Sequence, residues 1–110
     1  MIRLTTGLWI SAYRRRLQSE GIHVHIMHRG NDTAGDVIVK VATMDGQAML
    51  WERGWDDAGN PAWALTVGPV AEGEADETVG KRRARDRDLW VVEIEDPRGR
   101  HLLEDDTFRG

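Results

Sequence analysis

The chain has 110 residues, of which 40% are hydrophobic and 31% charged, and its formal net charge at pH 7 is −4. We expect a single domain over residues 1–110 without a membrane-spanning helix, because no apolar run approaches the roughly 18 residues that such a helix needs. The lack of cysteine excludes disulfides, thiolate metal sites and cysteine nucleophiles, and the negative charge disfavours a general attraction to nucleic acid.

The N-terminal segment predicts an amphipathic helix. Thr5 or Thr6 can cap its first turn, and Gly21 suits the position just after its last turn. Its large apolar side chains fall on one stripe: Trp9, Ile10, Tyr13 and Leu17. The basic residues 14–16 follow a short apolar stretch, which is the reverse of the order in a secretory signal peptide, so we expect a cytoplasmic protein.

Residues 22–27 alternate with a period of two, which predicts a strand. One face of this strand would be turned to the core: Ile22, Val24 and Ile26. The opposite face would carry polar and sulfur-containing side chains: His23, His25 and Met27.

Residues 36–44 and 47–53 predict a β-hairpin around Asp45-Gly46, a pair that suits a two-residue type I′ turn. This turn would pair Val41 with Leu50. One face of the hairpin would then belong to the core: Val37, Val39, Val41 and Leu50. The other face is more apolar than a wet surface requires, so we predict an interaction surface there: Ile38, Met49 and Trp51. A protein partner or a second subunit would cover this surface, or the first helix would cover it within the monomer.

The remaining sequence predicts a strand, a helix and a terminal hairpin. Residues 62–67 form the strand, and residues 74–87 the helix, with carboxylates at its start and cations at its end as the helix dipole favours. The next strand, 89–96, would turn Trp90, Val92 and Ile94 inward. A type I turn over 96–99 and a return strand over 100–103 would place Glu95 opposite His101. The order α-β-β-β-β-α-β-β predicts an α+β fold, with a mainly antiparallel sheet packed by two helices.

Two histidines are the candidate metal ligands. His23 and His25 lie two residues apart in a predicted strand, so both imidazoles leave the same face, and imidazole suits zinc, copper, nickel or iron. His28 has the opposite parity unless a bulge intervenes. A third ligand would come from His101, Glu93 or Glu95, if the terminal hairpin lies beside this strand. Two imidazoles are half of a tetrahedral site, so we expect no tight metal, while a weak nickel or zinc site stays open. We also expect no cofactor and no catalytic residue, because the sequence has no nucleophile elbow, phosphate loop or dinucleotide-binding loop.

Two alternative functions accompany the leading interpretation, which is a small binding domain that acts through a protein partner or self-association. The first alternative is a metal-dependent hydrolase that uses His23 and His25 with a carboxylate. The second is an RNA-binding module, with these residues as its cations: Arg14, Arg15, Lys81, Arg82 and Arg85. Consecutive arginines on a helix point in different directions, so neither basic cluster makes a flat patch by itself.

Three stretches of the chain together resemble a known family: TGLWISAYRRRLQSEGI, HRGNDTAGDVIVKV and RDRDLWVVEIEDPRGRHLLED. The family consists of short uncharacterised bacterial proteins and is called domain of unknown function fourteen-ninety-one. The resemblance covers nearly the whole chain. It implies a bacterial cytosolic origin and carries no activity and no site residue with it.

Overall fold

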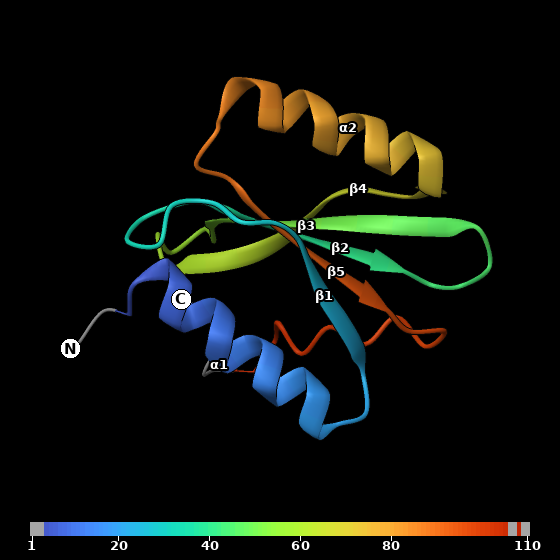
Figure 1. Cartoon of the computed structure of the whole chain (residues 1–110), viewed down its shortest axis with the longest axis horizontal. Coiled ribbons are helices and arrows are strands. Elements are labelled where there is room, and N and C mark those ends of the chain that lie inside the picture. Colours follow the sequence, from blue (N-terminus) through green and yellow to red (C-terminus); the bar gives the residue numbers. More distant parts are fainter. Residues whose placement is uncertain (1–3, 106–107, 109–110) are drawn as a thin grey trace.

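The computed structural model describes residues 4–105 and 108, which form a five-stranded sheet between two helices. Along the chain the elements are α1 (Thr6–Ser19), β1 (His23–His28), β2 (Val37–Ala42), β3 (Gln47–Trp55), β4 (Pro61–Ala71), α2 (Glu72–Arg85) and β5 (Trp90–Glu95). The strands lie in the order β1-β5-β2-β3-β4, and all neighbours are antiparallel except β5 and β2, which are parallel. The two helices cover opposite faces of the sheet (Figure 1), which confirms the predicted α+β class.

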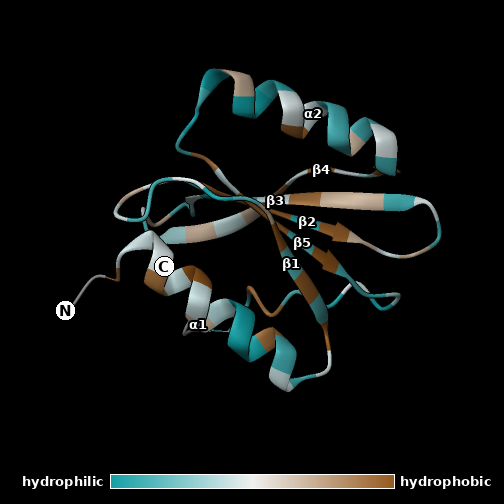
Figure 2. Cartoon of the chain, in the orientation of Figure 1, coloured by the Kyte–Doolittle hydropathy of each residue, from teal (hydrophilic) through white to brown (hydrophobic). Residues whose placement is uncertain are grey.

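The first helix forms as its sequence predicts. The Thr5 hydroxyl accepts a hydrogen bond from the backbone N–H of Leu8 at 3.4 Å, and Gly21 follows the helix with a φ of +72°. The predicted apolar stripe is buried against the sheet: Trp9, Ile10, Tyr13 and Leu17. In Figure 2 the remaining faces of both helices are largely polar, while brown apolar colour runs along the central strands. No helix in the described ranges is long and apolar enough to cross a membrane.

The predicted register of the β2–β3 hairpin is wrong by one residue. Val41 pairs with Met49 rather than with Leu50. The turn contains one residue more than the predicted Asp-Gly turn, because the Asp45 side chain closes it. This carboxylate accepts hydrogen bonds from the Gln47 N–H at 3.1 Å and the Thr43 hydroxyl at 2.6 Å. Since a one-residue shift reverses the face of every side chain on the second strand, Leu50 joins the α2 face and Trp51 joins the α1 face.

The predicted strand over residues 100–103 does not form in the described structure. The turn before it is confirmed, because the Gly99 N–H donates to the Asp96 carbonyl at 2.9 Å. Both edges of β5 are already paired, with β1 and β2, so no edge is left for a return strand. The chain instead passes to the α1 face, where the Tyr13 hydroxyl donates to the His101 carbonyl at 2.6 Å.

Both tryptophans predicted to lie in the core do so. Trp90 is 1% exposed and Trp9 is 5% exposed, on the α1 face of the sheet. The indole N–H of Trp90 also donates to the Asn31 carbonyl at 2.8 Å, which ties the β1–β2 connection to β5. The second helix begins and ends two residues earlier than predicted, with Glu72 and Glu74 in its first turn and arginines in its last.

Candidate functional site

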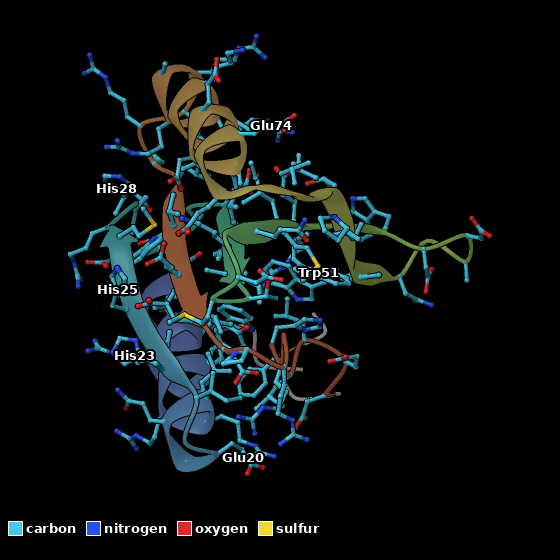
Figure 3. All side chains as sticks on the ribbon, turned by 90° about the vertical axis from the view of Figure 1, so that its right-hand side faces the viewer. Glu20, His23, His25, His28, Trp51 and Glu74 are labelled. Carbon is cyan, nitrogen blue, oxygen red and sulfur yellow. The ribbon has the colours of Figure 1, made fainter. Side chains whose placement is uncertain are left out.

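The candidate metal ligands lie on the edge strand β1, beside β5. His23 is opposite Glu95 and His25 is opposite Glu93 in the antiparallel ladder. The His23 Nδ1 is 3.2 Å from a Glu95 carboxylate oxygen, and the His25 Nε2 is 3.3 Å from a Glu93 oxygen. The predicted pairing of Glu95 with His101 is therefore wrong. Figure 3 shows the histidines spaced along β1.

One group of three side chains in this ladder has the composition of a metal site. The ligand atoms of His23, His25 and Glu95 all lie within 4.8 Å of one another. The two imidazole side chains are 71% and 47% exposed, so solvent reaches the group from outside. Of the third-ligand candidates that the sequence offers, the structure thus brings Glu95 to the histidine pair.

His28 also lies on the face of the other two histidines. A register shift between Ile26 and His28 lets His28 pair with Val91, whose side chain belongs to the α2 face. This is the bulge that the parity argument left open. Burial and the nearby Arg83 lower the pKa of His28, which is not a member of the three-residue group.

A buried lysine lies on the same face of the sheet, on the far side of Glu93 from His25. The Lys40 ammonium contacts the carboxylates of Asp76 at 2.6 Å, Glu93 at 2.8 Å and Glu72 at 2.9 Å. Burial alone would lower the pKa of Lys40, but its hydrogen bonds to the three carboxylates hold the pKa above its ordinary value. Because Glu93 contacts both Lys40 and His25, it links the buried charge network to the exposed imidazole.

The predicted interaction residues do not share a surface. Ile38 is 1% exposed and packs beneath α2. Met49 and Trp51 lie on the opposite face, partly buried against the α1 core, where the Trp51 ring lies 4.4 Å from the His101 ring. The wrong hairpin register had placed all three side chains on one face.

A different apolar surface is exposed near the start of α1. Leu4, Leu8 and Trp55 are 52%, 60% and 73% exposed. Leu4 and Trp55 also line a hollow of about 490 Å³, with Thr33 and Arg53 among its other walls. We call these three apolar side chains and the hollow the Trp55 surface. The sequence does not reveal this surface, because the predicted strand ends at residue 53, whereas β3 continues to Trp55.

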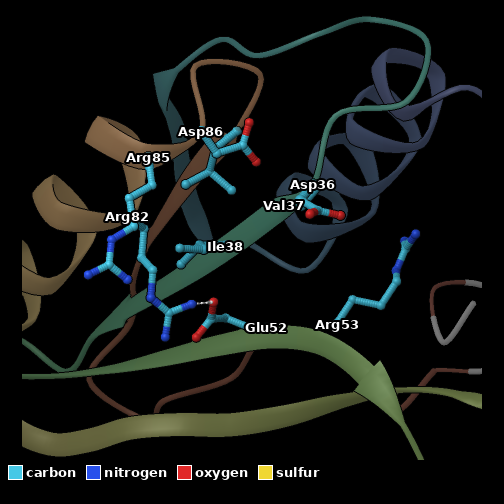
Figure 4. Close-up of a pocket in the computed structure, with 9 residues that line it drawn as sticks. Asp36, Val37, Ile38, Glu52, Arg53, Arg82, Arg85 and Asp86 are labelled. Carbon is cyan, nitrogen blue, oxygen red and sulfur yellow. Dashed lines mark hydrogen bonds and ion pairs between the residues drawn. The ribbon is translucent and has the colours of Figure 1, made fainter.

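The charged groups near the end of α2 neutralise one another. A hollow of about 260 Å³ there is lined by residues of both signs (Figure 4): Asp36, Glu52, Arg53, Arg82, Arg85 and Asp86. Arg82 is paired with Glu52. The C-terminal end of a helix disfavours anions, so this hollow does not suit a phosphate. The predicted RNA-binding cations also lie on two helices that cover opposite faces of the sheet, which separates Arg14 and Arg15 from the α2 cluster.

Comparison with known proteins agrees with the fold. The family model described as "Protein of unknown function (DUF1491)" matches residues 4–104. The chain belongs to this family. A crystal structure of a DUF1491 family protein from Caulobacter crescentus CB15 is 34% identical and superposes with a TM-score of 0.83, over 92% of this chain and 95% of that chain.

Two solution structures are also similar. An NMR structure of a DUF1491 family protein from Caulobacter crescentus CB15 is 33% identical, with a TM-score of 0.80 over 93% of this chain and 94% of that chain. Protein Atu0922 from A. tumefaciens is 25% identical, with a TM-score of 0.73 over 86% of each chain. No curated protein matches the chain. The family resemblance is thus confirmed, and the family brings no activity with it.

Proposed function

We propose that this member of the DUF1491 family is a binding domain that associates with a second copy of itself through the Trp55 surface. The observation that carries the proposal is that one patch holds both an indole that is 73% exposed and a hollow beside it. Tryptophan is enriched at the centres of protein interfaces, where it fills pockets on the partner.

Such a patch is complementary to itself. In a two-fold symmetric dimer the same surface of both copies faces the symmetry axis, so Trp55 of each copy can enter the hollow of the other. Leu4 and Leu8 would extend the apolar contact along α1. A standard interface buries about 800 Å² per partner, roughly an eighth of the 6807 Å² accessible surface, so the contact must extend beyond the indole to these leucines.

Sedimentation velocity over a range of protein concentrations tests the proposal. We expect a monomer–dimer equilibrium that Trp55→Ser weakens by roughly thirtyfold or more, since a buried interface tryptophan contributes about 2 kcal/mol or more. Met44→Gln is the matched control, because Met44 is 60% exposed but lies in the turn at the opposite end of β3.

The alternative occupants give different results. A protein that stays monomeric at every concentration contradicts self-association and leaves a different protein as the partner of the Trp55 surface. Equal weakening by Trp55→Ser and Met44→Gln would place the contact elsewhere on the molecule.

The compartment that we propose is the cytoplasm. The chain has no cysteine, so the stability of the domain rests on packing, hydrogen bonds and ion pairs, all of which persist under reducing conditions. Fractionation of the native host with an antibody against the protein tests this proposal, and recovery in an extracytoplasmic fraction would contradict it.

A further inference from the structure

We propose that His23, His25 and Glu95 bind a divalent transition metal ion, and that zinc is the ion that fits them best. Two imidazole nitrogens and one carboxylate oxygen are a ligand set that zinc uses in proteins, with water in the remaining position. Harder cations such as magnesium prefer oxygen ligands alone, which disfavours them at a pair of imidazoles.

The antiparallel ladder brings the three ligands together. His23 and His25 leave the same face of β1, and Glu95 is the direct cross-strand neighbour of His23. Their ligand atoms lie within 4.8 Å of one another. Ligands about 2.0–2.2 Å from a zinc ion lie roughly 3–4 Å apart, so a small rotation of the exposed rings completes the geometry.

The surroundings favour a cation. Around Lys40 and the two histidines lie four carboxylates, from Glu72, Asp76, Glu93 and Glu95, against the single lysine charge. The excess negative charge attracts a divalent ion. The Lys40 ammonium contacts three of these carboxylates, which leaves Glu95 to the exposed histidines.

Glu93 acts as a positioning residue for this site. Its side chain is 12% exposed and contacts both Lys40 and the His25 Nε2. A carboxylate beside one imidazole nitrogen, here 3.3 Å from the His25 Nε2, favours a ring orientation that leaves the other nitrogen for the metal. The Lys40 charge network, which lies on the same face of the sheet, therefore favours one orientation of the His25 imidazole before the ion arrives.

Calorimetric titration of the untagged protein with zinc chloride tests the proposal. We expect one ion per chain, competed by a chelator. His23→Ala and Glu95→Gln each remove a ligand and should abolish saturable one-to-one binding, whereas Glu93→Gln should weaken binding by about tenfold. Cobalt titration gives an independent readout, because its visible absorption changes when imidazole and carboxylate replace water.

His28→Ala is the matched control, since it removes another histidine from the same face of the same strand. It should leave zinc affinity unchanged. His23 lies on an edge strand and is 71% exposed, so circular dichroism should show a folded domain for His23→Ala, and the same measurement checks the folding of the other variants. Absence of saturable binding overturns the proposal, and so does binding that His23→Ala and Glu95→Gln leave intact, which would show an adventitious site elsewhere.

Discussion

Asp96 and Arg100 form an ion pair across the turn after β5, which we call the clasp. We expect Asp96→Asn to lower the free energy of unfolding of the domain. The Asp96 residue is 4% exposed. Its carboxylate accepts hydrogen bonds from the Arg100 backbone N–H at 2.7 Å and from two guanidinium nitrogens at 3.0 and 3.1 Å. These bonds direct the chain from β5 to the α1 face, where the His101 carbonyl accepts from Tyr13.

The expected loss follows from the charge. A hydrogen bond to a charged group contributes about 1.5–3 kcal/mol, and an asparagine keeps one acceptor oxygen while it turns an amide donor toward the guanidinium. Arg100 is about one-third exposed and can regain water, which limits the penalty. We expect Asp96→Asn to lower the free energy of unfolding by about 2 kcal/mol at pH 7, measured in urea with an unchanged slope.

The pH dependence separates the clasp from a general packing defect. Hydrogen bonds from Arg100 lower the pKa of Asp96 in the folded protein. A group with a lowered folded pKa stabilises the fold above its unfolded pKa of about 3.9, and this stabilisation is lost as the pH falls through the folded pKa. The difference between wild type and Asp96→Asn should therefore be constant from pH 5 to 8 and shrink below about pH 4.

Two results would refute this reasoning. One is an Asp96→Asn protein within about 0.5 kcal/mol of the wild type at pH 7, which is the range of an ordinary surface substitution. The other is a difference that persists undiminished in acid. Asp57→Asn serves as the control, because Asp57 is an exposed carboxylate in the loop between β3 and β4.

Two further predictions concern the core. Trp90→Ala should lower the free energy of unfolding in urea by about 3–5 kcal/mol. Trp55→Ala should lower it by less than about 1 kcal/mol in the monomer, because Trp55 is exposed whereas Trp90 is buried. Equal losses for the two variants would contradict the burial argument. Burial lowers the pKa of His101, whose Nδ1 accepts a hydrogen bond from the Leu103 N–H at 3.0 Å. The stabilisation that the neutral imidazole contributes is therefore complete above about pH 6.5 and is lost as the pH falls below that value. His101→Asn keeps an acceptor and should flatten the fall in melting temperature between pH 7 and 5; an unchanged pH profile would exclude His101 as its cause.

Local signals predict local structure well in this chain. The cap at Thr5, the glycine at position 21 and the apolar stripe define α1, because all three act within a few turns of one helix. The inward parity of Trp90 also holds, since side-chain alternation is a property of the strand alone. Neither inference requires knowledge of which segments meet.

The incorrect predictions concern features that depend on one side-chain interaction or on the pairing of strands far apart in the sequence. The hydrogen bonds of Asp45 widen the β2–β3 turn, and that single change moves Leu50 and Trp51 to the opposite faces from those predicted. The parallel pairing of β2 with β5 occupies the edge that the predicted return strand needed. The hydrophobic periodicity of the sequence indicates neither the length of this turn nor which strand pairs with β5.

The candidate metal site combines the two kinds of information. His23 and His25 share a face because of strand parity, which the sequence shows, whereas Glu95 reaches them only because β1 pairs with β5. That pairing also makes β1 an edge strand, so the imidazoles lie outside both apolar cores. Replacing them should therefore change metal affinity with little change in stability. Because the fold does not depend on these two imidazoles, a loss of metal binding in their variants can be measured in a protein that is still folded.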